Sequence, residues 1–364
     1  MITIIEYENL AKVNHKFRSE LLDEFASCLT DGQFILGPRL RTFESEFSNY
    51  IGSKFCIGVS TGLDALTLAL RSLNLPPGSE VIVPSVTFVA TVLAVIQAGL
   101  VPVMVDPDPV SCLITPVQIE QASSTCTSAV IPVHLYGGTC DMPSIMSLAE
   151  SKGWKVIEDA AQCHGGELNG KKAGSFGVGA FSFYPTKTLG ALGDAGCVTT
   201  NDEEVANSIR KLRDYGRTNK YESDILGYNN RLDEIQAAFL SIKLKYLDSI
   251  NSHKRKLASI YQSQLNGVTL PYDSGTHVYH VFAIRSNERD NLQRFLLEKG
   301  IQTSIHYPVP VPRQKVVTEY VWDEDDYPVA DEISSTTLSL PLSYFHTEDE
   351  ILKVCDCVNE FTRS

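Results

Sequence analysis

The stretch from Val156 to Gly196 reads VIEDAAQCHGGELNGKKAGSFGVGAFSFYPTKTLGALGDAG, and the rest of the chain is arranged around it. Its opening apolar run predicts a buried strand, with Asp159 at the polar exit. A second apolar run, Ala180–Tyr184, predicts another strand, which Pro185 stops. Because open α/β sheets bind ligands at the carboxyl ends of their strands, we expect Asp159 and Lys187 at one sheet edge.

An acid and a lysine at one sheet edge are the two groups that pyridoxal phosphate requires. A lysine amine forms a Schiff base with the cofactor's aldehyde, and a carboxylate facing the pyridine nitrogen keeps that nitrogen protonated. Each residue alone has a plainer interpretation, since most lysines are solvated and an acid at a strand end often caps a helix. The pair is what a pyridoxal phosphate site needs, with Lys187 and Asp159 as its catalytic residues, and the surrounding motifs favour this interpretation over the plainer ones.

Three longer motifs surround this pair: EDAAQCHG at 158–165, SFYPTKTLGALGDAG at 182–196 and GYNNRLDEIQAA at 227–238. Together they resemble the DegT/DnrJ/EryC1/StrS family of sugar aminotransferases, over about residues 34–351. The resemblance implies the α/β fold of a fold type I aminotransferase. Such a fold has a large domain with a mostly parallel mixed sheet flanked by helices, and a smaller C-terminal α/β domain.

Composition limits the partners and the compartment. With 44 acidic and 31 basic residues, the net charge of −13 argues against a nucleic-acid or acidic-membrane surface, which needs clustered positive charge. The nine cysteines form no CxxC pair, so they predict reduced thiols and no metal site. The polar beginning does not read as a signal peptide, and no apolar run is long enough to span a membrane. We therefore expect a cytoplasmic protein.

Upstream of the central stretch, the pattern predicts a phosphate-binding turn. Helical spacing of apolar residues ends at Gly52, a strand follows at Cys56–Val59, and Ser60–Asp64 opens the next helix. A small-residue turn between a strand and a helix N-terminus binds anions, although an ordinary capped helix has the same pattern. The resemblance places the cofactor phosphate here, at Gly62 and Leu63; relatives usually have threonine at the second position.

The alternation of strands and helices continues on both sides of this turn and predicts a mostly parallel sheet covered on both faces. We expect strands at Val81–Pro84, Val101–Val105, Ala129–His134, Lys155–Ile157 and Gly196–Thr199, with helices at Thr87–Gln97, Met142–Ser151 and Asp202–Tyr215. Beyond residue 235 a long helix is expected over Gln236–Leu265. We place the domain boundary near 240, giving a large cofactor-binding domain at 1–240 and a small C-terminal domain at 241–364.

The resemblance also assigns cofactor contacts. It implies that Gln162 contacts the phenolic oxygen, Ser182 the phosphate and Phe88 the ring face, and that Asn229 reaches the phosphate of a neighbouring subunit. The last role implies a homodimer with shared active sites. Alternation along Ala180–Tyr184 turns Ser182 and Tyr184 toward the site, with the intervening phenylalanines toward the core.

The substrate side needs cations, because an acidic protein must hold the two phosphates of a sugar nucleotide. The candidates are Arg217, Lys220, Arg231 and Arg313, each of which is otherwise a surface charge. The resemblance adds His306 and Tyr307 of SIHYPVP, and His164 and Tyr184 are further candidates.

The sequence around Lys187 resembles that of enzymes that aminate C3 of dTDP-linked 3-keto-6-deoxyhexoses, with glutamate as the amino donor. The alternatives are amination at C4 of a 4-keto sugar, a lyase or dehydratase on the same fold, and a non-catalytic regulator that kept the fold. Relatives with histidine at the lysine position dehydrate sugars, so Lys187 favours transamination. A nicotinamide enzyme is not expected, because no early GxGxxG occurs.

Overall fold

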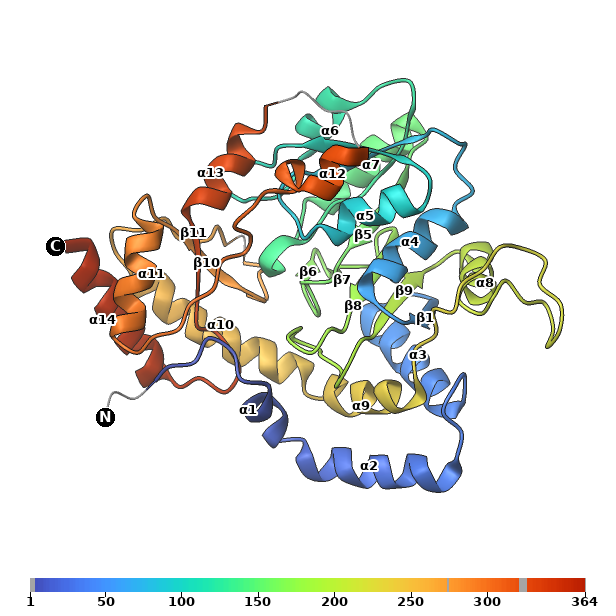
Figure 1. Cartoon of the computed structure of the whole chain (residues 1–364), viewed down its shortest axis with the longest axis horizontal. Coiled ribbons are helices and arrows are strands. Elements are labelled where there is room, and N and C mark those ends of the chain that lie inside the picture. The colour runs from blue at the N-terminus through green and yellow to red at the C-terminus, as the bar shows by residue number, and fades with distance from the viewer. Residues whose placement is uncertain (1–3, 274, 321–325, 364) are drawn as a thin grey trace.

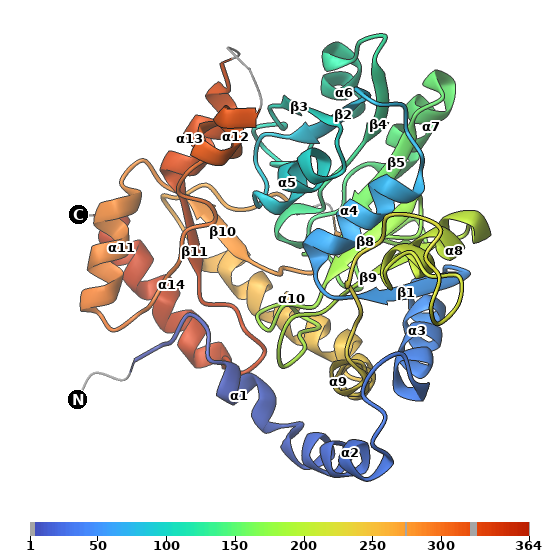
Figure 2. The ribbon, with the colours of Figure 1, turned by 45° about the vertical axis from the view of Figure 1, so that its right-hand side comes forward.

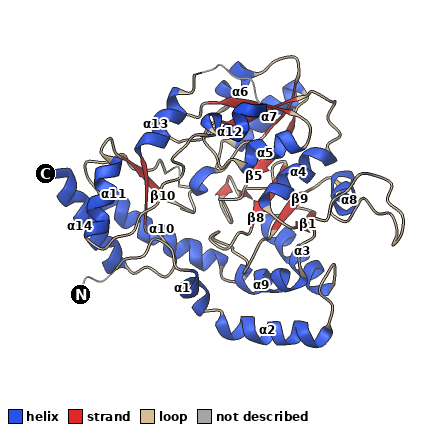
Figure 3. Cartoon of the chain, in the orientation of Figure 1, coloured by secondary structure: helices blue, strands red, loops and turns tan. Residues whose placement is uncertain are grey.

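The computed structural model describes residues 4–273, 275–320 and 326–363. Figure 1 shows the chain, and Figure 3 shows its helices and strands. The first half contains α1 (Leu10–His15), α2 (Arg18–Asp31), α3 (Pro38–Ile51), β1 (Phe55–Val59), α4 (Gly62–Ser72), β2 (Glu80–Pro84), α5 (Ala90–Gln97), β3 (Val101–Val105), α6 (Pro116–Ala122), β4 (Thr127–Val130), η1 (Leu135–Gly137), α7 (Met142–Lys152), β5 (Lys155–Asp159), β6 (Glu167–Leu168), β7 (Lys171–Lys172) and β8 (Val178–Ser182). The second half contains β9 (Gly196–Thr200), α8 (Glu203–Leu212), α9 (Glu234–Leu244), α10 (Leu247–Gln264), β10 (Phe282–Arg285), α11 (Arg289–Glu298), η2 (Val311–Arg313), α12 (Lys315–Tyr320), α13 (Pro328–Thr336), β11 (Thr337–Leu340) and α14 (Glu348–Arg363).

The main sheet has seven strands in the order β1-β9-β8-β5-β4-β2-β3. All neighbouring pairs from β8 to β3 are parallel, and β9 is antiparallel to both β8 and β1. The prediction of a mostly parallel mixed sheet is therefore confirmed. The carboxyl ends of β5 and β8 lie side by side, because Asp159 pairs with Ala180. This register puts Asp159 and the turn after β8 at one sheet edge.

Helices cover both faces of the sheet, and strand alternation decides which side chains meet them. On one face, Ile57, Ala180 and Val198 join a core cluster with α4, α5 and α8. On the other face, Phe181 and Cys197 pack against α3 and α9, while α6 and α7 cover the far end. Figure 2 shows the sheet between these two layers. The expected inward orientation of Phe181 and Phe183 is confirmed, since both side chains are fully buried.

The C-terminal part is built on the antiparallel pair β10–β11, covered by α10, α11 and α14. Its core includes Ile5, whose backbone bridges to Ile301, so the first described residues pack here and not with the large sheet. Conversely, residues of α12 and α13 join the cluster on the large sheet. The boundary near 240 stays a prediction, and the side-chain clusters cross it in both directions.

Several element boundaries differ from the sequence-based expectation, and two of the differences lie near the site. The helix expected over Gln236–Leu265 is two helices, α9 and α10, because the chain leaves helical hydrogen bonding around Tyr246. Tyr246 packs on Phe17 with 5.2 Å between ring centroids, and the apolar spacing continues across the break. The strand containing Ala180 ends at Ser182 and not at Tyr184.

No helix among the described residues has the length and apolarity to cross a membrane.

Candidate active site

Asp159 is the last residue of β5, and its carboxylate is held in place from two sides. Oδ2 accepts a hydrogen bond from Thr91 Oγ1 on α5 (2.8 Å), and Oδ1 accepts one from the Ala161 N–H (3.2 Å). Thr91 in turn exchanges a hydrogen bond with Thr87 (2.8 Å). Burial raises the pKa of Asp159, against the effect of these donors. A cationic group facing this carboxylate, such as the protonated pyridine nitrogen of the cofactor, would favour the ionised form of Asp159.

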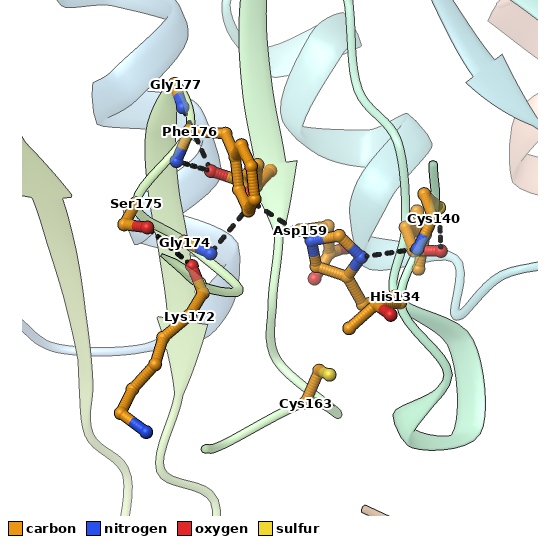
Figure 4. A network of polar contacts seen from close by, with 12 residues as sticks. His134, Cys140, Asp159, Cys163, Lys172, Gly174, Ser175, Phe176 and Gly177 are labelled. Carbon is orange, nitrogen blue, oxygen red and sulfur yellow. Dashed lines mark hydrogen bonds and ion pairs between the residues drawn. The ribbon is translucent and has the colours of Figure 1, made fainter. Parts of the chain in front are cut away.

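Strand alternation turns the neighbouring Glu158 to the opposite face of the sheet from Asp159. Figure 4 labels the residues that hydrogen-bond to its carboxylate: His134, Gly174, Phe176 and Gly177. The fully buried Glu158 carboxylate accepts backbone N–H bonds from Gly174 (2.8 Å), Phe176 (2.7 Å) and Gly177 (3.0 Å). His134 Nδ1 accepts from the Cys140 N–H, so its Nε2 carries the proton and donates to Glu158 (3.1 Å). Three backbone donors thus fix the strand end that carries Asp159 to the loop before β8, and His134 fixes it to the segment after β4.

Glu158→Gln is expected to lower the free energy of unfolding by about 3 kcal/mol or more. The amide cannot accept at its nitrogen, so at least one buried N–H loses its partner and the other bonds lose their charge assistance. Urea denaturation measures the change. Glu167→Gln in the adjacent hairpin is the matched control, because its exposed pair with Lys172 spans 3.5 Å and contributes little. Equal stability losses in the two variants would contradict this account of Glu158.

Lys187 lies in the compact turn after β8, where its N–H bonds to the Tyr184 carbonyl (2.8 Å). A side chain at Gly190 would lie 2.4 Å from the Pro185 carbonyl oxygen, so this turn closes only around a glycine. Burial lowers the pKa of Lys187 to about 8, and the Asp159 charge acts in the opposite direction. Near neutral pH a larger fraction of this amine than of an ordinary lysine is therefore uncharged, which is the nucleophilic form.

A phosphate cradle adjoins this turn at the N-terminus of α4. Within the described part of the chain, the N–H groups of Gly62 and Leu63 have no acceptor, whereas Thr61 Oγ1 caps the Asp64 N–H (3.0 Å). A Cβ on Gly62 would approach the Ser182 Cβ to 2.5 Å, so only glycine lets the turn lie against β8. Two free N–H groups and the Ser182 hydroxyl fit the phosphate of pyridoxal phosphate.

A residue from the segment before α9 supports the cradle. Asn230 donates from Nδ2 to Asp64 Oδ1 (2.7 Å). Asp64 also accepts from Ser60 Oγ (2.6 Å) and Thr61 Oγ1 (2.7 Å). The asparagine therefore fixes the loop around the first turn of α4.

A cluster of aromatic and amide groups stands beside Asp159. Gln162 Oε1 accepts from the Tyr136 N–H (2.7 Å), and its Nε2 donates to Tyr307 Oη (2.9 Å). The Phe88 ring lies 5.7 Å from that of Tyr307. His306 Nδ1 bonds with Ser339 Oγ (2.8 Å), and burial lowers its pKa to about 4. The structure thus brings Gln162, Tyr307, His306 and Phe88 together.

Other predicted substrate ligands are not gathered here. The His164 side chain is 1% exposed and lies between Phe181 and Phe183, with ring centroids 5.7 and 5.5 Å away. It packs on the core face of β8, and its contact with the substrate stays a prediction. Tyr184 is exposed beyond the end of the strand and does not share the face of Ser182 as a strand residue.

The four candidate cations also lie on the surface of this chain. Arg217 and Arg231 both pair with Asp214, at 3.8 and 3.0 Å, and Arg313 pairs with Asp331 at 3.0 Å. Lys220 stands over the Tyr221 ring at 5.4 Å. Figure 1 shows the loop between α8 and α9, which carries Arg217 and Lys220, extending outward beyond α8. Their predicted contacts with a sugar nucleotide stay predictions.

Several residues that shape the site were not found by sequence reasoning. Thr91, Glu158 and Asn230 act by holding other parts of the site in place. Only Thr91 could have been suspected from the sequence, because Thr87 lies four residues before it and such a pair can interact along a helix. Tyr7 comes from the N-terminal stretch, and its ring lies 6.0 Å from that of His306.

Fold and site together define a pyridoxal phosphate-dependent enzyme of the aminotransferase class: a lysine and an acid at the strand ends of a doubly wound sheet, beside a phosphate cradle. The profile of the DegT/DnrJ/EryC1/StrS aminotransferase family matches residues 15–359, and the chain belongs to that family.

Two relatives and one solved structure are similar over nearly the whole chain. The dTDP-3-amino-3,6-dideoxy-α-D-galactopyranose transaminase of Aneurinibacillus thermoaerophilus is 44% identical, covering 98% of this chain and 99% of the relative. The dTDP-3-amino-3,4,6-trideoxy-α-D-glucose transaminase of Streptomyces venezuelae is 40% identical, covering 98% and 96%. The crystal structure of S. venezuelae DesV in complex with a ketimine intermediate has a TM-score of 0.96 at 40% identity, covering 99% of each chain.

Proposed function

We propose that this enzyme transfers an amino group from glutamate to C3 of a dTDP-linked 3-keto-6-deoxyhexose, in the biosynthesis of a deoxyamino sugar. The observation that carries the proposal is the similarity to the two transaminases, at 44% and 40% identity, whose names both specify a dTDP-linked 3-amino sugar. Amination at C4 is not favoured, because neither name places the amino group there. The presence of both Lys187 and Asp159 argues against a non-catalytic regulator.

Pyridoxal phosphate, when bound, supplies the electron-accepting ring and the aldehyde carbon that carries the amino group. Asp159 would hold the proton on the ring nitrogen. The N–H groups of Gly62 and Leu63, with the Ser182 hydroxyl, would bind the phosphate. The Lys187 amine, with its pKa near 8, takes the proton from the donor's Cα and returns a proton at the sugar carbon.

We also propose a cytoplasmic homodimer with shared active sites. Asn229 is exposed in this chain and follows the outward loop between α8 and α9, where a second subunit can meet it. The same loop exposes Ile225 and Leu226, at 42% and 80%, which a partner surface would cover. Arg217 and Lys220 would then face the partner's sugar nucleotide.

The test is to follow the two half-reactions of the holoenzyme separately by absorbance. Glutamate alone should remove the long-wavelength absorbance of the bound cofactor, because the donor leaves its amino group there. Adding the dTDP-linked 3-keto-6-deoxyhexose should restore it, whereas the 4-keto isomer should restore it at least about tenfold more slowly. Equal or faster recovery with the 4-keto sugar would overturn the C3 assignment.

A further inference from the structure

A partly enclosed pocket behind the Lys187 turn has more lysines than acidic residues in its lining. It is lined from the loop after β8 by Lys187, from α9 by Lys243, from α10 by Lys254 and from the N-terminal stretch by Glu8. Figure 2 shows that loop lying against α10. Three lysines therefore face one carboxylate, inside a protein whose overall charge is −13.

The two lysines at the back of the pocket are buried, and the charge of Glu8 acts on Lys254 without a direct ion pair among the described residues. Lys243 and Lys254 are each 5% exposed. Lys254 Nζ donates to the His280 carbonyl (3.2 Å), and Lys243 Nζ donates to the Gly190 carbonyl (2.6 Å). Neither forms an ion pair with a carboxylate in the described ranges; Glu8 instead accepts from the Asn9 N–H at 3.1 Å. Burial lowers the pKa of both lysines to about 8. A bound anion would favour their charged form, and each ammonium group would still have two N–H donors to offer it.

The position of the pocket indicates which anion. Because Lys187 lines it, the pocket adjoins the place where the amino-carrying carbon would be bound. An amino donor carries a carboxylate one bond from the reacting carbon, and its 2-oxo acid product keeps that group. An ammonium group in a poorly solvated pocket binds a carboxylate more strongly than one at the surface does.

We propose that this pocket is the carboxylate subsite for the amino donor and for the 2-oxo acid it becomes, with Lys254 as its main cation. The inference rests on the proposed function, since it requires an amino-acid donor. Lys243 assists, but its bond to Gly190 also holds the Lys187 loop. Lys254 is therefore the position at which binding can be tested separately from loop structure.

The test compares Lys254→Met with Lys256→Met in the holoenzyme. Lys256 lies two residues along α10, its side chain is 64% exposed and it pairs with Glu348 at 2.5 Å, so it provides a control for the same substitution. Lys254→Met should raise the apparent Kd for glutamate in its half-reaction about tenfold or more. Calorimetric binding of glutarate, which has the carboxylates but no amine, should weaken by a similar factor. The half-reaction with the 3-amino sugar should stay within about twofold, and Lys256→Met should change none of these values.

Unchanged glutamate and glutarate binding in Lys254→Met would overturn the subsite and show that the pocket holds only water. If the wild-type enzyme itself neither reacts with glutamate nor binds glutarate, the proposed donor is wrong instead. Should Lys254→Met not fold, Lys254→Arg and Lys254→Gln make the same comparison. The arginine variant should keep carboxylate binding within about threefold, and the glutamine variant should lose it; equal binding by the two would contradict the proposal.

Discussion

Lys187→Ala should have no measurable turnover, a loss of at least about 10⁴-fold, while keeping the wild-type fold. The side chain supplies both the amine that binds the cofactor covalently and the base that moves the proton, and general bases alone contribute roughly 10²–10⁴-fold. Steady-state assays measure the loss, and circular dichroism checks the fold. The variant should also lack the absorbance of covalently attached cofactor. Turnover within about tenfold of wild type would remove Lys187 from the mechanism.

The same variant tests whether active sites are shared. If Asn229 acts in the partner's site, a mixed dimer of Lys187→Ala and Asn229→Ala subunits contains one intact site and one doubly altered site. Random mixing makes about half of the dimers mixed, so about a quarter of wild-type activity should return. Each variant alone must be strongly impaired for the comparison to apply. Mixtures no more active than the average of their components would argue for self-contained subunits.

Asp159→Asn should bind the cofactor but lose most of the rate, on the order of 10²–10³-fold in kcat. Asparagine has the same shape and can still accept a hydrogen bond from Thr91, whose hydroxyl lies 2.8 Å from the Asp159 carboxylate in the wild-type protein. It carries no negative charge, however, so nothing holds the proton on the ring nitrogen and the ring withdraws electrons poorly.

Stopped-flow absorbance of both half-reactions measures the loss, and both should slow. Asp356→Asn, on the exposed face of α14, is the matched control and should leave the rates unchanged. A wild-type rate in Asp159→Asn, with cofactor bound, would mean that another group supports the ring nitrogen.

Periodicity predicted much of the fold because it reports which side of each element is buried. Alternation along Ala180–Tyr184 correctly placed Phe181 and Phe183 in the core, and the glycine after the third helix correctly marked its end at Gly52. The break at Tyr246 was missed, because two non-helical residues hardly disturb the apolar spacing of a long helix. The burial of His164 was not predicted, because a motif places a residue near a site without saying which face of the sheet it occupies.

The sequence by itself determined the class of chemistry, because a lysine and an acid at consecutive strand ends share an edge in any parallel sheet. Only the tertiary structure decided how those two groups are held and what surrounds them. Glu158 meets the loop before β8, Asn230 meets Asp64, and Lys254 comes to line the same pocket as Lys187. Most of these contacts join residues far apart in the chain, and they depend on how whole layers pack. Local patterns record burial and turns, and they carry no information about such partners.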